Sequence, residues 1–169
     1  AYLLEAKSVL IPEIAYPTYK VGALLARAEV LEVGIDAITW PKKAGLAWIN
    51  SPSNPTGRIH SKEELEACLT WARKSGATLA SDECYLTFTN GIKAHSILAI
   101  ANGDNTSVLA VHSLSKRSNM AGYRGAFVSG DPKLIAQLLE IRKHMGMMLP
   151  LPIQKSMAIA LSDQSHVDK

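Results

Sequence analysis

The amino-acid sequence predicts an α/β domain in which helices cover a mostly parallel β-sheet. Short apolar runs, several rich in β-branched residues, alternate along the chain with segments that have helical spacing. Such alternation is typical of parallel sheets, because each helix returns the chain to the edge where the next strand starts. Clusters of turn-forming and polar residues follow several of the apolar runs, as expected where strands end.

The first half of the chain begins with a strand, helix and strand unit. The apolar runs at 8–11 and 29–33 predict two strands, and the segment between them has helical spacing over 19–28, after Pro17. A further strand is expected at 45–50, where the chain runs into a dense cluster of Ser, Pro, Asn and Gly. The chain therefore has to turn sharply at this point.

A second helix is predicted to begin after Ser61. Ser61 and Glu64 have the spacing of a capping box, and Gly76 is placed to end the helix. The residues between them put one apolar stripe on a single helical face: Leu65, Cys68, Leu69 and Ala72.

The second half of the chain repeats the alternation. Strands are expected at 78–81, 107–112 and 126–129. Asp131 and Pro132 then have the residue types of a helix start, an N-cap followed by a proline in the first turn. The apolar positions of that helix are Leu134, Ile135, Leu138, Leu139 and Ile141.

Polar side chains follow three of these predicted strands. Asn54 lies in the turn after 45–50, Asp82 follows 78–81, and Ser113 and Lys116 follow 107–112. Ligands of open α/β sheets bind outside the carboxyl ends of the strands. We therefore expect these four residues to meet at one rim of the sheet.

Composition narrows the class of protein. The 169 residues are 47% hydrophobic and 20% charged, which is typical of one soluble globular domain, and no apolar run is long enough to span a membrane. The net charge of +3 is spread along the chain, so we predict no nucleic-acid partner. The two cysteines, Cys68 and Cys84, match no metal motif, and we interpret them as reduced thiols of a cytoplasmic protein.

Three motifs carry a resemblance to a known family. Taken singly, an Asn-Pro-Thr-Gly stretch is a turn, an Asp after a strand is a cap, and a lysine is a surface residue. In order and spacing, however, the set resembles the class I and II aminotransferases, which are pyridoxal 5′-phosphate (PLP) enzymes of fold type I. The motifs are Asn54-Pro55-x-Gly57, Asp82-x-x-Tyr85, and Ser113-x-Ser115-Lys116 followed by Arg124.

The resemblance implies a catalytic role for three residues. Lys116 would hold the PLP cofactor as a Schiff base and, once displaced by the substrate amine, would move the proton between the substrate α-carbon and the cofactor. Asp82 would face the pyridine nitrogen and keep the ring protonated. Tyr85 would donate a hydrogen bond to the phenolic oxygen of the cofactor.

Further cofactor-binding residues follow from the same resemblance. Asn54 would share the phenolic oxygen with Tyr85, and Tyr16 would stack on the pyridine face, although core packing is an alternative role for Tyr16. The hydroxyls of Ser113 and Ser115 and the guanidinium group of Arg124 would bind the phosphate.

The family pattern also sets expectations for the segment around Arg124 and for the chain as a whole. One residue usually separates the arginine from the following glycine, whereas Gly125 comes directly after Arg124 here, which leaves the local backbone path open. We expect 1–169 to be part of a three-layer α/β/α large domain, incomplete at both ends. The N-terminal segment, which carries a phosphate-binding loop, and the small C-terminal domain, which carries the substrate-carboxylate arginine, would lie outside this sequence. The complete enzyme is expected to be a homodimer, and these 169 residues alone are expected to be inactive.

Substrate choice rests on further resemblance. The stretches 83–85, 112–124 and 142–148 look like those of actinobacterial-type N-succinyldiaminopimelate aminotransferases of lysine biosynthesis. Such an enzyme would exchange an amino group between glutamate and N-succinyl-2-amino-6-ketopimelate. The methionines of 142–148 have a simpler interpretation as flexible packing residues.

Three alternatives share the same cofactor residues. The first is an aminotransferase for aspartate, alanine or aromatic amino acids, with small amino and 2-oxo acids as substrates. The second is a carbon-sulfur β-lyase of the same fold. The third is a regulatory domain fused to a DNA-binding module, although no basic block in these residues supports it.

Overall fold

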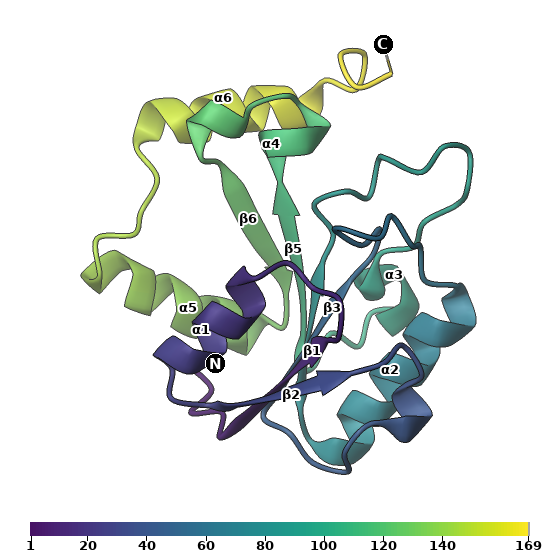
Figure 1. Ribbon diagram of the computed structural model, residues 1–169. Helices are drawn as coiled ribbons and strands as arrows, with labels where there is room; N and C mark the ends of the chain where they lie inside the picture. The colour runs from purple at the N-terminus through teal and green to yellow at the C-terminus, as the bar shows by residue number, and fades with distance from the viewer. Residues whose placement is uncertain (169) are drawn as a thin grey trace.

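The structure, a computed structural model, describes residues 1–168 and is an α/β fold built on one mixed sheet (Figure 1). The sheet has six strands in the order β2-β1-β3-β4-β5-β6, in which only β6 runs antiparallel to its neighbour. The strands are β1 (Ser8–Pro12), β2 (Glu29–Val33), β3 (Leu46–Asn50), β4 (Thr78–Asp82), β5 (Val108–Ser113) and β6 (Ala126–Gly130).

Six α-helices and two short 3₁₀ helices connect and cover these strands. The longer α-helices are α1 (Thr18–Leu25), α2 (Lys62–Ser75), α5 (Pro132–His144) and α6 (Leu151–Ser162). The shorter elements are α3 (Ile97–Ala101), α4 (Leu114–Arg117), η1 (Ala37–Thr39) and η2 (Ala121–Tyr123).

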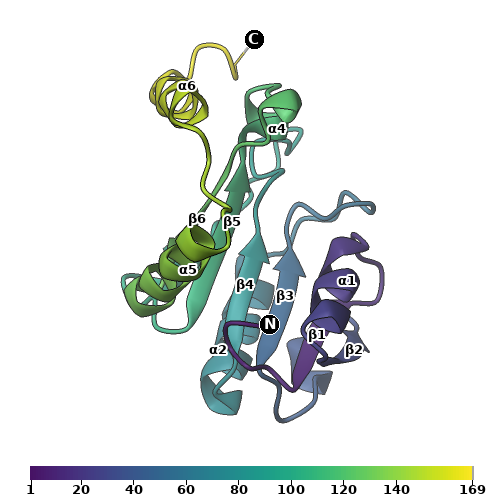
Figure 2. The ribbon, with the colours of Figure 1, turned by 90° about the vertical axis from the view of Figure 1, so that its left-hand side faces the viewer.

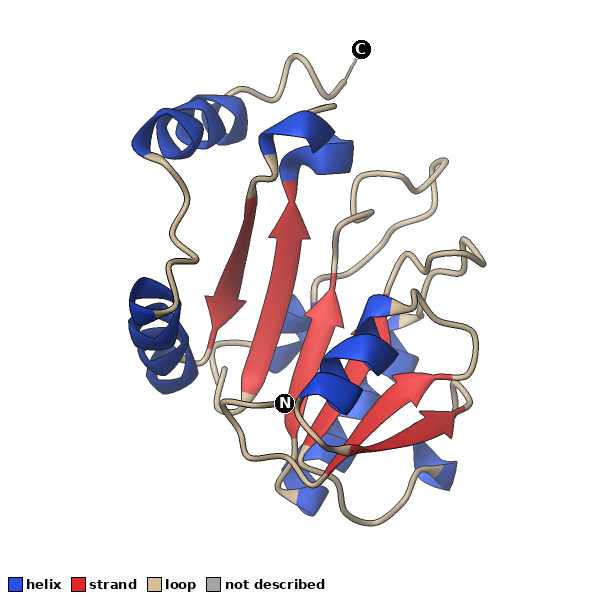
Figure 3. Ribbon diagram, turned by 60° about the vertical axis from the view of Figure 1, so that its left-hand side comes forward, coloured by secondary structure: helices blue, strands red, loops and turns tan. Residues whose placement is uncertain are grey.

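Two apolar clusters lie on opposite faces of the sheet. Successive residues of a strand point to opposite faces, and the strand residues divide between the clusters with this period of two. One cluster joins the sheet to α2 and α3, and the other joins it to α1. Figures 2 and 3 show these layers from two further sides. The predicted arrangement of helices on both faces of a mostly parallel sheet is therefore confirmed.

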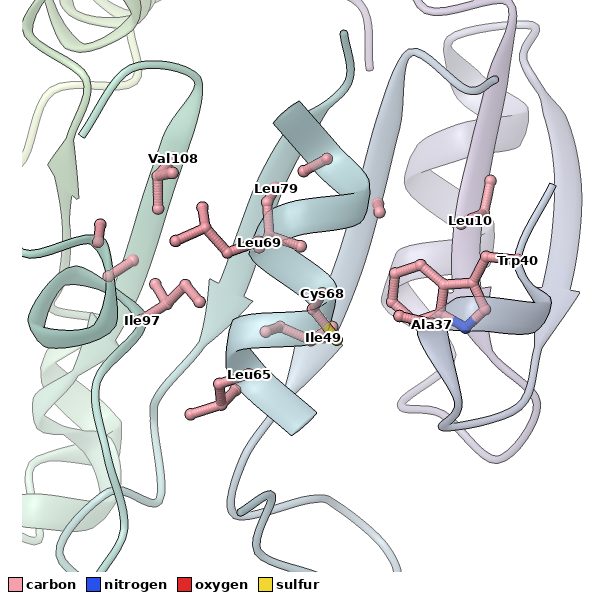
Figure 4. Packing of buried hydrophobic residues seen from close by; sticks show 14 of the residues in the cluster. Leu10, Ala37, Trp40, Ile49, Leu65, Cys68, Leu69, Leu79, Ile97 and Val108 are labelled. Carbon is pink, nitrogen blue, oxygen red and sulfur yellow. The ribbon is translucent and has the colours of Figure 1, made fainter. Parts of the chain in front are cut away.

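Helix α2 has the local signals that the sequence predicted. Ser61 accepts a hydrogen bond from the Glu64 amide while the Glu64 side chain accepts one from the Ser61 amide, and Gly76 ends the helix in a left-handed conformation. The apolar stripe, including Leu65 and Leu69, packs on the sheet beside residues such as Leu79 (Figure 4).

All the predicted strands are present, and their ends differ from the predicted ends by no more than one or two residues. Strand β6 is antiparallel to β5. The helix predicted over 19–28 is shorter in the structure. Helix α1 ends at Leu25, and the chain turns at Arg27, whose φ is 55°. The prediction did not include α3, α4 or α6. Helix α6 is rich in apolar residues but buries only Met157, and these residues do not gather on one face, so no amphipathic stripe marks the helix in the sequence.

The carboxyl ends of the parallel strands β3, β4 and β5 meet at one edge of the sheet. Asn50, Asp82 and Val111 lie side by side across these strands in register. The segments that follow these ends carry the residues that the sequence singled out.

Candidate active site

The candidate active site lies at the carboxyl edge of the central strands. Asp82 is the last residue of β4 and Ser113 the last of β5, and Lys116 lies in α4 directly beyond it. Asn54 lies in the turn that follows β3. The fold thus brings residues that are up to 62 positions apart in sequence, Asn54 to Lys116, to the same edge.

The carboxylate of Asp82 is held from two sides. The Tyr19 hydroxyl donates a hydrogen bond to Asp82 Oδ2 over 2.6 Å, and the Cys84 amide donates one to Asp82 Oδ1 over 3.1 Å. Tyr19 comes from α1, on one face of the sheet, and Cys84 comes from the turn after β4. Both carboxylate oxygens therefore have a fixed donor, which sets the plane of the carboxylate.

Tyr19 is a site residue that the sequence prediction missed. Its ring is buried and stacked on Trp48, with centroids 5.0 Å apart and an interplanar angle of 17°. Burial, together with the negative charge and hydrogen bond of Asp82, raises the pKa of the Tyr19 hydroxyl far above its usual range. The hydroxyl therefore stays protonated and serves as a donor. Only its spacing of three residues from Tyr16 could have pointed to it.

A cavity of about 330 Å³ opens beside this hydrogen bond. Its lining joins α1 to β1, β3, β4 and β5 and includes Tyr16, Tyr19, Trp48, Asp82 and Val111. The Tyr16 and Tyr19 rings meet edge to face with centroids 6.4 Å apart. A carboxylate within a largely aromatic and apolar wall suits a flat heterocycle that carries a positive charge.

Lys116 and Tyr85 also lie close together. The Lys116 amine sits 5.9 Å from the centroid of the Tyr85 ring, which is within range of a cation–π contact, and Lys116 is exposed. Burial and the adjacent Asp82 raise the pKa of the Cys84 thiol to about 12, an effect that the positive charge of Lys116 partly opposes. Cys84 is therefore a protonated thiol at neutral pH.

Asn50 is a second residue that the sequence prediction missed. Its buried side chain donates to the carbonyl oxygens of Pro52 and Asp82, over 3.1 and 2.9 Å, and accepts from the Asn54 amide over 2.7 Å. This one amide group therefore ties the turn that carries Asn54 to the end of β4. No local motif marks Asn50, because its partner strand lies 32 residues further along.

The residues proposed for phosphate binding gather around the turn that joins β5 to β6. The Ser113 hydroxyl accepts from the Ser115 amide at 3.1 Å and contacts the Gly125 carbonyl oxygen at 3.4 Å. Arg124 adopts a left-handed conformation with φ of 54° and donates to the Ala121 carbonyl oxygen, and its side chain is exposed. The backbone thus accommodates the missing residue between Arg124 and Gly125 by the left-handed conformation of Arg124 itself.

The structure brings the predicted residues to one edge but not into one cavity. Asp82 and Tyr16 line the same cavity, whereas Asn54, Tyr85 and Lys116 are not part of its lining and lie in the segments that follow β3, β4 and β5. Ser113, Ser115 and Arg124 form a separate group at the β5 end.

Residues 1–168 contain neither a candidate membrane span nor a candidate metal cluster. None of the helices combines the length and hydropathy that a bilayer span requires. In the same residues, the His, Cys, Asp and Glu side chains form no group of three or more that could hold a metal ion.

Comparison with known proteins gives a family match over almost the whole chain. The family model for aminotransferase class I and II matches residues 2–169. The chain belongs to the class I and II aminotransferases.

Individual aminotransferases agree with this membership. A probable aminotransferase of Mycobacterium tuberculosis is 48% identical over 165 residues, which are 95% of this chain and 39% of that protein. A 4-dedimethylamino-4-oxo-anhydrotetracycline transaminase of Streptomyces rimosus is 44% identical over 164 residues, 96% of this chain and 46% of that protein.

The fold also matches solved structures. A probable N-succinyldiaminopimelate aminotransferase from Thermus thermophilus superposes with a TM-score of 0.89 at 26% identity, covering 98% of this chain and 50% of that one. The chain thus spans half or less of the length of these aminotransferases.

Proposed function

We propose that the complete protein is a PLP-dependent aminotransferase whose cofactor binds at the edge described above. The observation that carries this proposal is the Asp82 carboxylate, which is fixed by Tyr19 in a cavity with aromatic walls and lies at the same sheet edge as the amine of Lys116. Family membership supports the same chemistry. When bound, PLP supplies an electron sink for the carbanion that forms when the substrate α-proton leaves.

The residues of this chain would then have distinct tasks. Asp82 would hold a proton on the ring nitrogen, because it lines the cavity and its two oxygens are already oriented by Tyr19 and Cys84. Lys116 would hold the cofactor through its amine and would serve as the group that moves the proton at the substrate α-carbon. Tyr16 provides a ring face at the wall of the cavity.

Five donors complete the proposed binding set. Asn54 and Tyr85 donate to the phenolic oxygen of the cofactor, and Asn50 fixes the turn from which Asn54 reaches it. The exposed guanidinium group of Arg124 binds the phosphate with Ser115. Ser113 joins them by exchanging its long contact to Gly125 for the phosphate.

For the substrate, we propose amino transfer between glutamate and N-succinyl-2-amino-6-ketopimelate. The fold match to a probable N-succinyldiaminopimelate aminotransferase supports this choice, as do the stretches 83–85, 112–124 and 142–148. A second candidate is the amination of a ketone on a larger ring system, favoured by 44% identity to the transaminase of Streptomyces rimosus.

We also propose that the complete enzyme is a cytoplasmic homodimer. Helix α1 supports self-association, because Val21, Leu24 and Leu25 are 51%, 58% and 81% exposed and offer an apolar surface. Sedimentation of the full-length enzyme should give twice the mass of one chain.

The cofactor proposal is tested on the full-length enzyme. We expect the purified enzyme to show the visible absorption band of bound PLP, and reduction with borohydride followed by peptide mass spectrometry should place the adduct on Lys116. Lys116→Ala should abolish the band, whereas the exposed helix residue Lys155 serves as control and Lys155→Ala should keep it. An adduct on another lysine would refute the assignment.

The reaction type is tested with substrates. A transaminase should convert its cofactor to the pyridoxamine form with glutamate, and the relative kcat/KM for the succinylated keto acid and for aspartate, alanine and aromatic partners then identifies the substrate. A β-lyase would instead release pyruvate and ammonia and keep the original band.

A further inference from the structure

Glu83 follows Asp82 in sequence but faces the opposite side of the sheet. Asp82 reaches Tyr19 of α1, whereas the Glu83 carboxylate accepts a hydrogen bond from the Ile97 amide of α3 at 2.8 Å. The Glu83 amide also continues the β4–β5 ladder by donating to the Val111 carbonyl oxygen at 2.8 Å. A change in the position of the Glu83 side chain would therefore also move the backbone next to Asp82.

The Glu83 side chain is completely buried, yet only one of its oxygens has a hydrogen-bond donor. Oε1 is bonded to Ile97, and Oε2 has no such partner among residues 1–168. A buried carboxylate is costly unless a positive charge compensates it. The group placed to do so is His112, whose Nε2 lies 3.5 Å from Glu83 Oε2.

His112 is adjacent in sequence to Ser113, as Glu83 is to Asp82, but it comes before its neighbour instead of after it. It directly precedes Ser113 on β5, and its ring is stacked on Phe127 of β6 with centroids 4.9 Å apart. The side chain is 22% exposed, so the imidazole is mostly enclosed. The contact between Glu83 and His112 therefore connects the end of β4, next to Asp82, with the end of β5, next to Ser113.

A cavity of about 150 Å³ lies beside the pair, lined by Glu83, Cys84, His112, Phe127 and Arg117 among others. Arg117 is the other cation on this wall. Its guanidinium group donates to Ser118, to the Ala160 carbonyl oxygen and to Gln164, which directs it toward α6. Helix α3, which covers Glu83, consists of Ile, Leu and Ala residues and brings no charge. His112 is thus the nearest compensating group for the carboxylate.

We propose that Glu83 and His112 form a buried ion pair that positions Asp82 and Ser113 for cofactor binding. Both are positioning residues, since they act from the face of the sheet opposite Asp82 through the ends of β4 and β5. The inference rests on the proposed function, because the quantity that the pair controls is the fit of the site to PLP.

The test is a double-mutant cycle in the full-length enzyme, with PLP affinity of the apoenzyme as readout. His112→Gln leaves the buried carboxylate without a counter-charge, and we expect it to weaken PLP binding by about tenfold or more. Glu83→Gln keeps an oxygen for the Ile97 amide and removes the charge, so its loss should be smaller. The double variant should bind PLP more tightly than His112→Gln alone, because it no longer holds an uncompensated charge.

The same four proteins should be unfolded with urea in the apo form. This second cycle measures the coupling of Glu83 and His112 without the cofactor. An exposed pair on α5, Glu140 with His144 at 2.9 Å, provides a matched control. Glu140→Gln and His144→Gln should leave PLP affinity unchanged and show little coupling.

Each failure has its own signature. Additive effects of the two substitutions on unfolding would overturn the ion pair itself. Coupling in unfolding with unchanged PLP affinity in every variant would overturn the positioning role and leave a purely structural pair. A wild-type enzyme that binds no PLP would refute the proposed function, while the unfolding cycle would still show whether the two side chains interact.

Discussion

The Tyr19 hydroxyl and the Asp82 carboxylate are joined by a 2.6 Å hydrogen bond across 63 positions of the sequence. The bond connects α1 to the carboxyl end of β4, so the helix that covers one face of the sheet also orients the acid at its edge. Because the tyrosine is buried against Trp48 and stays protonated, the direction of donation is fixed.

Tyr19→Phe should remove this donor while keeping the stacked ring. A hydrogen bond to a charged group contributes about 2 kcal/mol, so we expect the free energy of unfolding of the full-length protein to fall by about that amount. PLP affinity should fall as well, because Asp82 loses one of its two fixed donors. Urea unfolding and cofactor titration measure the two effects. Tyr2→Phe, at a side chain that is 76% exposed, should change neither, and equal effects at both positions would contradict the prediction.

Asn50→Ala should destabilise the turn that carries Asn54. The substitution removes the acceptor of the Asn54 amide and the side-chain donor of the Pro52 carbonyl oxygen, whereas the Asp82 carbonyl oxygen keeps the Ser51 amide at 3.3 Å. Unsatisfied buried groups of this kind cost about 1 to 3 kcal/mol each, so a loss of about 3 kcal/mol in unfolding free energy is expected. Denaturant titration measures it, and a loss below about 1 kcal/mol would show that water replaces the side chain.

Gly130→Ala should be strongly destabilising, because Gly130 has a φ of 137° and an added Cβ would overlap the backbone oxygen of Val108. We expect a loss of about 3 kcal/mol or more, seen as a fall in the melting temperature or as insoluble protein. Gly22 is the matched control. It lies inside α1 with open space around its Cβ position, and Gly22→Ala should stabilise the protein by about 0.5 to 1 kcal/mol. Equal outcomes at the two glycines would contradict the assigned backbone.

Asp131 should make stability depend on acid pH. Hydrogen bonds from the Ser107 amide, and then from the Lys133 and Leu134 amides, hold the pKa of Asp131 below its usual value. A lowered pKa means that the stabilisation is present above the unfolded pKa of about 3.9 and is lost as the pH falls through the folded value.

Asp131→Asn removes this charge and keeps one oxygen to cap α5, but its NH2 group cannot accept from the Ser107 amide. The variant should be about 1 kcal/mol less stable than the wild type at pH 7, and the difference should shrink below about pH 4. Urea unfolding at several pH values measures it. Glu29→Gln, at an exposed residue, should show no such convergence, and a gap that widens in acid would reverse the assigned sign.

Local signals explain what could be predicted from the sequence. The capping box of Ser61 and Glu64 and the left-handed Gly76 act within a few residues, so α2 was predicted almost to its ends. Asp82 and Ser113 were placed correctly at strand ends because a polar residue after an apolar run is also a local pattern.

The missed features depend on distant partners. Tyr19 acquires its role through Asp82, 63 positions away, and Asn50 joins its own turn to β4 through the Asp82 carbonyl oxygen, 32 positions away. Helix α4 has four residues, which make about one helical turn and are too few to show a periodic pattern of apolar residues.

The separation of core and rim in this sheet has a consequence for evolution. Asn54, Asp82 and Ser113 are carried at the ends of three different strands, while the interior is built from the strands and their covering helices. A change in the length or composition of one connecting loop therefore leaves the packing of the interior in place. Such modularity lets new substrate preferences arise by loop variation on an interior that stays the same.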